Sequence, residues 1–172
     1  MKKIEMNPNT LFSERQYFRQ IWLGLVLLAI NALFIYGIVH NIVSTQGPKM
    51  SNAVLCLALG FTLLLSLLFL LVRLETEIRA DGIYFRFFPF QTSYKIYRWE
   101  AIAECFVTQY HPIKDYGGWG IRGSFGGKGK AYTVSGDMGI QMVLTDGKRI
   151  LLGTKQPEEA KEAMRKAGRV KY

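Results

Sequence analysis

The sequence contains few of the side chains that most often bind metals or form covalent cross-links, with two cysteines and two histidines in 172 residues. Cys56 and Cys105 form no C-x-x-C pair and lie in segments of different character, so we expect neither a disulfide nor a thiolate site. His111 and Asp115 are four residues apart, but Pro112 between them disfavours a helix that would align them. No third ligand is near. We therefore expect no metal site and no cofactor.

Two long segments also lack charge. Residues 21–43 contain no formally charged side chain, and residues 53–72 are apolar almost throughout. As helices, both segments reach the roughly 30 Å thickness of a bilayer's hydrocarbon core. A pair of buried core helices is the alternative, but the rest of the chain is too short to cover them. The first segment is also too far from the N-terminus, and too long, for a cleaved signal peptide. We predict two retained membrane-spanning helices.

Basic residues flank these segments unequally, and the bias predicts their orientation. The connecting loop holds one basic residue, Lys49. Near the other two ends lie Lys2, Lys3, Arg15, Arg19, Arg73 and Arg79. Because cytoplasmic flanks carry the excess of lysine and arginine, we expect a multi-pass protein of the cell membrane with both termini in the cytoplasm.

The opening residues, 1–20, contain a helix-start signature. Ser13 is followed three residues later by Gln16, as in a capping box. Aromatic residues that favour the headgroup region come next: Tyr17, Phe18 and Trp22. We predict a short cytoplasmic interfacial helix that continues into the first span.

Beyond residue 72 the apolar residues alternate with a period of two, which indicates a mainly β domain over residues 73–172. Asp81-Gly82 is a hairpin signal between the first two strands. Seven strands are predicted: 74–80, 83–88, 94–99, 103–110, 131–134, 139–144 and 148–153. A C-terminal helix is predicted over 157–167, with Pro157 in its first turn and one apolar stripe. Together these elements predict a small barrel, or two orthogonal sheets, capped by that helix.

This order of elements resembles the pleckstrin-homology (PH) superfold. More closely, the chain resembles bacterial membrane proteins that carry a PH-like domain after a two-helix anchor. The resemblance rests on FSERQYFRQIWL (12–23), EIRADGIYFRFFPF (77–90), YRWEAI (97–102), YHPIKDYGGWGIR (110–122) and AYTVSGDMGIQMVLTDGKRILLGTKQPEE (131–159). It implies a fold and a location, and PH-like domains in general bind lipid headgroups, peptides or partner domains.

A glycine-rich segment at 116–130 contains a literal G-x-G-x-x-G at Gly118, Gly120 and Gly123. In dinucleotide-binding loops a helix begins at the last glycine and points its N-terminus at the phosphates. Here a glycine-rich loop and then a strand follow instead, and no P-loop spacing fits. We expect a loop whose glycines serve tight bends, and no nucleotide.

The same segment supplies the candidate binding residues, Tyr116, Trp119, Arg122, Lys128 and Lys130. One interpretation is structural, with Tyr116 and Trp119 folded back to seal one end of the core. The other places Trp119 in the membrane interface while the basic residues meet phosphate headgroups. A protein-binding surface is a third use of the loop.

The chain has a net charge of +9, and residues 73–172 contribute +6 of it (17 basic and 11 acidic residues), which fits a basic domain held beneath anionic lipid. Basic and acidic residues are interspersed, so we expect no nucleic-acid binding. No two catalytic groups occur at a mechanistic spacing, and we expect no enzyme. The leading hypothesis is a non-enzymatic module at the cytoplasmic membrane face that binds lipid headgroups or partner proteins. An accessory subunit of a membrane complex is the alternative, and an enzyme of unrecognised type is the weakest hypothesis.

Asn31 lies near the middle of the first predicted span. Its side chain could join the two spans, or a second copy of the chain, by a hydrogen bond.

Overall fold

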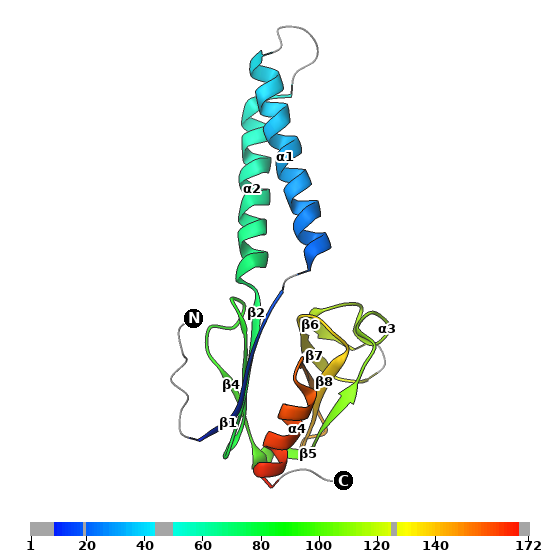
Figure 1. Cartoon of the computed structure of the whole chain (residues 1–172). Helices are drawn as coiled ribbons and strands as arrows, with labels where there is room; N and C mark the ends of the chain where they lie inside the picture. Colours follow the sequence, from blue (N-terminus) through cyan, green and yellow to red (C-terminus); the bar gives the residue numbers. More distant parts are fainter. Residues whose placement is uncertain (1–8, 19, 44–49, 125–126, 169–172) are drawn as a thin grey trace. The chain divides into compact units, whose positions relative to one another are not determined.

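The computed structural model describes residues 9–18, 20–43, 50–124 and 127–168. The chain divides into two compact units. Phe18–Val72 form a helix unit, and the residues described on both sides of it form a β unit. The β unit is therefore built from two chain segments that the helices separate in the sequence (Figure 1).

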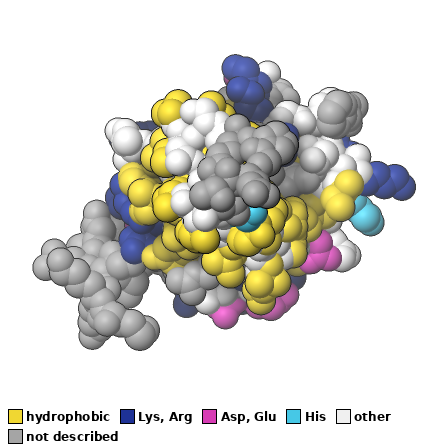
Figure 2. Space-filling view, turned by 90° about the horizontal axis from the view of Figure 1, so that it is seen from above, with side chains coloured by type: hydrophobic (Ala, Val, Ile, Leu, Met, Phe, Trp, Pro, Cys, Tyr) yellow, Lys and Arg dark blue, Asp and Glu magenta, His cyan; other side chains and the backbone are white. Residues whose placement is uncertain are grey.

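The helix unit consists of α1 (Ile21–Val43) and α2 (Asn52–Leu71), close to the predicted bounds. Both are long and apolar enough to span a membrane, and only 6% of the most apolar window of each is buried. A core helix of a soluble protein would be mostly buried. The space-filling view from above shows a large area of hydrophobic side chains, in agreement with the exposed apolar residues of the pair (Figure 2). Lys2, Lys3, Arg19 and Lys49, which entered the orientation argument, lie outside the described residues.

The predicted interfacial helix is wrong. Thr10–Tyr17 form strand β1, which pairs antiparallel with β2 (Arg73–Arg79) from Tyr17 opposite Arg73 to Thr10 opposite Arg79. Alternate side chains of β1 are buried, namely Phe12, Glu14 and Gln16. That period of two fits a half-buried strand, and pairing with β2 supplies the hydrogen bonds that a helix cap would have provided.

The first sheet is antiparallel in the order β1-β2-β3-β4, with β3 at Gly82–Phe88 and β4 at Lys95–Arg98. The predicted hairpin between β2 and β3 is confirmed, although its turn lies at Ala80-Asp81 because Arg79 pairs with Gly82. Gly82 is needed for a different reason, since a Cβ there would clash with the Tyr97 carbonyl oxygen of β4.

The second sheet has the order β5-β8-β9-β7-β6; of its described strand pairs, β7–β9 is parallel and the other three are antiparallel. Its strands are β5 (Ile102–Gln109), β6 (Gly120–Gly123), β7 (Lys130–Thr133), β8 (Met138–Leu144) and β9 (Arg149–Gly153). The prediction of seven strands missed β1 and β6. The described strands form two separate sheets and not one closed barrel.

The predicted C-terminal helix is confirmed as α4 (Pro157–Lys166), which packs against β1, β2, β5 and β8 (Figure 1). Its buried stripe is Ala160, Ala163 and Met164. Small side chains on this stripe allow the helix to approach both sheets closely. Fully buried residues of the strands complete the core, including Leu74, Ile78, Ile83, Phe85, Ile140, Met142 and Leu152.

Strand β1 also ties the two sheets together. The Gln16 side-chain amide donates to the Gly153 carbonyl oxygen at 2.6 Å. Glu14 accepts hydrogen bonds from the Thr154 hydroxyl at 2.6 Å and from the Lys155 amide at 2.8 Å. These polar groups are buried or half-buried, so their pairing matters for stability. A fragment that begins after the helices would lack all of these bonds, so experiments on this protein need the full chain.

Candidate functional site

A short helix precedes the glycine-rich segment, contrary to the expectation that Pro112 would prevent one. Pro112 begins α3 (Pro112–Tyr116), and the preceding His111 amide donates to the Asp115 carboxylate at 3.0 Å. Proline is tolerated at the first helical position because its missing N–H has no intrahelical partner there. The helix positions Tyr116 above the second sheet.

Both aromatic candidates of the segment pack onto the β domain. Tyr116 is 3% exposed and lies in a cluster with Tyr110, Ala131 and Leu151. Trp119 is half-buried, and its indole N–H donates to the Gly136 carbonyl oxygen at 2.9 Å. This arrangement agrees with the structural interpretation of the two side chains.

The three basic candidates remain at the surface. Arg122 is exposed on β6, and its Nε–H donates to the Trp119 carbonyl oxygen at 3.4 Å. Lys128 forms an ion pair with Asp115 at 2.7 Å. Lys130 is exposed at the start of β7. In the β6–β7 pair Lys130 lies opposite Gly123, the neighbour of Arg122, so the Arg122 and Lys130 side chains point to opposite faces. Among the described residues of the segment, the charge is therefore dispersed and forms no anion site.

A cavity of about 290 Å³ lies on the face of the second sheet away from α4, and Tyr116 and Lys128 line it. Glu104 and Arg149 contribute one charge of each sign, and Asp115 offsets Lys128. Burial raises the pKa of Tyr110 to about 12 and raises that of Tyr116, so both phenols stay neutral at pH 7. The lining is balanced in charge and does not select an anion.

A different arrangement occupies the outer face of the first sheet. Glu75 on β2 is 2% exposed, with Arg15 on β1 and Arg86 on β3 directly opposite it. The Nε of Arg15, Arg73 and Arg86 lie 2.9, 2.7 and 2.6 Å from the carboxylate oxygens of Glu75. We call these four residues the arginine cluster. A single carboxylate therefore orients three guanidinium groups.

The contacts of the arginine cluster leave hydrogen-bond donors exposed. Each arginine contacts Glu75 through Nε, so its two terminal amino groups are not used there. One terminal amino group of Arg86 donates to the Thr92 carbonyl oxygen at 3.3 Å. Among residues that the structure describes, no acceptor contacts the terminal groups of Arg15 or Arg73. These donors are available to a ligand.

Aromatic rings hold two of the guanidinium planes in place. Arg73 lies over the ring of Phe88 at 4.4 Å, and Arg86 lies over the ring of Tyr94 at 4.7 Å. The Tyr94 hydroxyl donates to Glu75 at 2.9 Å. Stacking and ion pairing already restrict these long side chains, so less conformational entropy is lost when a ligand binds. The cluster is preorganised.

The charge of Glu75 follows from its partners. Burial raises its pKa, but hydrogen bonds from Arg86, Tyr94 and Arg73 and the nearby charge of Arg15 outweigh this and lower the pKa. Burial and the bond to Glu75 raise the pKa of Tyr94 to about 12. At neutral pH the cluster therefore carries three positive charges and one negative charge.

Arg79, on the same face, is arranged differently. Its Nε and one terminal amino group both donate to Glu77, at 2.9 and 2.7 Å, and its guanidinium lies over the Tyr84 ring at 4.1 Å. This one-to-one pair is neutral. Arg79 is therefore a matched reference for the arginines around Glu75.

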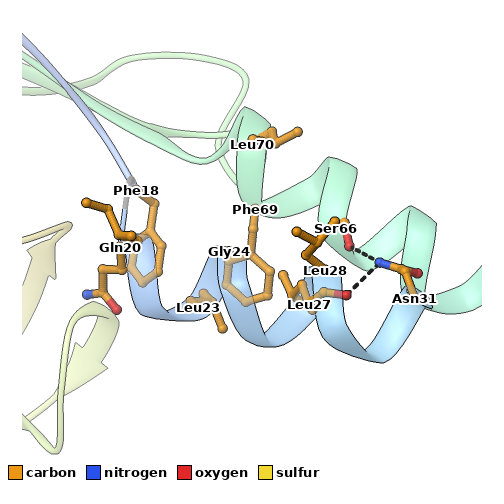
Figure 3. Close-up of a pocket in the computed structure, with 11 residues that line it drawn as sticks. Phe18, Gln20, Leu23, Gly24, Leu27, Leu28, Asn31, Ser66, Phe69 and Leu70 are labelled. Atoms are coloured by element: carbon orange, nitrogen blue, oxygen red, sulfur yellow. Dashed lines mark hydrogen bonds between the residues drawn. The ribbon is translucent and has the colours of Figure 1, made fainter. Parts of the chain in front are cut away.

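The helix unit contains a separate cavity of about 530 Å³ between α1 and α2. Its lining has no charged side chain and includes Phe18, Gly24, Leu27 and Phe69. Figure 3 shows Asn31 at the end of the cavity away from Phe18 and Gln20, where its side-chain amide donates to the Ser66 hydroxyl at 3.2 Å and to the Leu27 carbonyl oxygen at 2.8 Å.

Thr62 completes the polar contact between the helices, because its hydroxyl donates to the Asn31 carbonyl oxygen at 2.6 Å. The expectation that Asn31 joins the two helices is confirmed. Since its amide and its carbonyl are both used within the helix pair, the cavity presents mainly apolar surface.

Residues 6–169 match DUF6141, a family of unknown function. The chain belongs to the DUF6141 family. No curated protein and no solved structure matches it. Within the described part of this DUF6141 protein, no three His, Cys, Asp or Glu side chains are grouped as metal ligands.

Sequence reasoning missed the arginine cluster of this DUF6141 protein. Its sequence signal is the alternation Arg73-x-Glu75-x-Glu77-x-Arg79, which places four charges on one face of a strand. That pattern alone does not identify the neighbours of Glu75. They depend on the pairing of β1 with β2 across both helices and on the register of β3.

Proposed function

We propose that this DUF6141 protein is a non-enzymatic module of the cell membrane that binds anionic phospholipid headgroups at the cytoplasmic face. Its two apolar helices would span the bilayer, with both termini in the cytoplasm as the distribution of basic residues favours. Two sheets with a packed C-terminal helix are compatible with the PH-like resemblance of the sequence. In PH-like domains such a scaffold commonly presents a binding surface.

The arginine cluster carries this proposal. Val72 alone separates Arg73 from Leu71, the last residue of α2, and Arg15 lies on the strand that leads into α1. Along the chain, Arg15 and Arg73 therefore lie within a few residues of the ends of the proposed spans. A basic group close to an anionic leaflet contributes about 1 kcal/mol of attraction, and a fixed guanidinium adds forked hydrogen bonds to phosphate. The glycine-rich segment offers charge without this preorganisation.

Native mass spectrometry of the full chain in mild detergent tests the proposal. We expect phosphatidylglycerol adducts to exceed phosphatidylcholine adducts and to decrease as ammonium acetate is raised. Replacing Arg15 and Arg73 by Gln should remove this preference, whereas Arg79→Gln should preserve it.

Equal adducts with both lipids, or a preference that survives Arg15→Gln with Arg73→Gln, would contradict headgroup binding by the cluster. A fixed protein partner that copurifies with wild type and with the double variant alike would favour the accessory-subunit alternative.

A further inference from the structure

We infer that the arginine cluster is a site for a phosphomonoester dianion, presented by a membrane lipid of the phosphatidic acid type. This inference rests on the proposed function and specifies the ligand of the same surface. It separates two headgroup chemistries, the terminal phosphate of a phosphomonoester and the internal phosphate of a phosphodiester.

The charges of the cluster match a dianion. Three guanidinium groups surround one carboxylate of lowered pKa, so the group has an excess of two positive charges. A phosphomonoester carries about −1.5 to −2 charges at pH 7 and has three strong acceptor oxygens. A phosphodiester carries a single charge and has two non-bridging oxygens. The monoester therefore offsets the charge excess more completely.

The free donors also match three acceptor oxygens. Arg15 and Arg73 both contact the same Glu75 oxygen, so their guanidinium groups lie side by side. Their terminal amino groups are unused among the described residues, and Arg86 has one terminal group beyond its contact with Thr92. Terminal amino groups of neighbouring arginines form parallel N–H···O bonds with phosphate, a geometry that lysine does not reproduce.

Glu75 acts as a positioning residue in this arrangement. It is almost fully buried, while Arg73 and Arg86 are half-buried and Arg15 is exposed. A ligand can therefore approach the guanidinium groups from the solvent side without displacing the carboxylate. A buried carboxylate that separates three like charges allows them to coexist before the phosphate arrives.

The test is a competition on the full chain in detergent, read by native mass spectrometry. Phosphatidic acid, phosphatidylglycerol and cardiolipin are supplied at equal concentration and with the same acyl chains. Cardiolipin controls for charge because it carries two phosphodiesters and no phosphomonoester. We expect phosphatidic acid to be preferred over either lipid by roughly tenfold, the value of one additional charge-assisted hydrogen-bond pair.

Two variants distinguish forked recognition from general charge. Arg15→Lys with Arg73→Lys keeps the charge and should reduce the phosphatidic acid preference to about that of cardiolipin. Arg79→Gln should leave the preference intact. The thermal unfolding midpoint of each variant is measured in the same detergent, so a folding defect is separated from a binding defect. Inorganic phosphate in excess should compete only weakly, because it lacks the acyl chains.

The outcomes separate this inference from the proposed function. Equal binding of the three lipids, with dependence on the arginines, would overturn the phosphomonoester site and leave headgroup binding in place. Anionic-lipid binding that does not depend on the arginines would overturn both. A phosphatidic acid preference retained by the double lysine variant would also overturn the site. Strong competition by inorganic phosphate would assign the site to soluble phosphate instead of lipid.

Discussion

The β domain carries two basic regions that differ in how their charges are held. In the arginine cluster, three guanidinium groups converge on one buried carboxylate, and aromatic rings fix two of them. In the glycine-rich segment, Arg122, Lys128 and Lys130 are exposed and dispersed, and Lys128 is already paired with Asp115. Fixed donors without a partner therefore indicate an anion site better than the number of basic residues does.

Removing the Glu75 carboxylate at the centre of the arginine cluster should change the stability of the protein most. Glu75→Ala leaves three neighbouring guanidinium groups without their partner, and we expect it to lower the free energy of unfolding by about 3 kcal/mol. Asp115→Ala, in the other region, should lower it much less because that ion pair is at the surface. Chemical denaturation of the full chain in detergent measures both. Similar losses would show that the two regions are held alike.

In the glycine-rich segment the backbone should be constrained even though the basic side chains are not held in place. Gly129 has a φ of +88°, and a Cβ there would clash with the Arg149 carbonyl oxygen. We expect Gly129→Ala to destabilise the protein by about 2 kcal/mol. Gly127 has a φ of +80° with open space around its Cβ position, so Gly127→Ala is the control and should cost about 1 kcal/mol. If thermal unfolding shows equal losses of stability for the two variants, the close approach of the Arg149 carbonyl oxygen to Gly129 is not the cause.

Acid should weaken the arginine cluster through Glu75. The folded-state pKa of Glu75 lies below its ordinary value of 4.5, so its ionised form stabilises the fold above that value. This stability should be lost as the pH falls below 4.5 through the folded pKa. Glu75→Gln should make unfolding less dependent on pH in that window, measured by denaturation at several pH values. An identical dependence in wild type and variant would contradict the ion pairing.

The smallest effect is expected at Trp119. Trp119→Phe keeps the ring packing and removes the hydrogen bond to the Gly136 carbonyl oxygen, which should cost about 1 kcal/mol. Lipid adducts should not change, because the arginine cluster is intact. A loss of anionic-lipid binding in this variant would instead support the interface interpretation of the glycine-rich segment.

The helices and strands that were predicted best from the sequence are those whose pattern lies within one short stretch of residues. The apolar runs of α1 and α2, the stripe of α4 and the β2–β3 hairpin are each complete within a short window. Strand β1 was missed because Ser13 and Gln16 fit a capping box as well as an alternating strand, and its partner follows two helices later. Strand β6 contains glycines at both ends and has little side-chain pattern.

The candidate site was less predictable for a related reason. The aromatic and basic residues of the segment 116–130 are adjacent in sequence, which made that segment conspicuous. The arginine cluster needs three strands in a fixed register, and Arg15 and Glu75 belong to segments on opposite sides of the helices. Sequence alone cannot supply a register that is set by packing and by backbone pairing over such a distance.

The lipids that accompany the protein out of its own membrane give the sharpest test of headgroup binding by the arginine cluster. The full chain is extracted in polymer-bounded discs, and the phospholipid classes in the discs are compared with those of the bulk membrane. We expect anionic phospholipid to be enriched with wild type and with Arg79→Gln, and not enriched with Arg15→Gln, Arg73→Gln and Arg86→Gln combined. The same lipid composition around wild type and the triple variant would contradict headgroup binding by the arginine cluster.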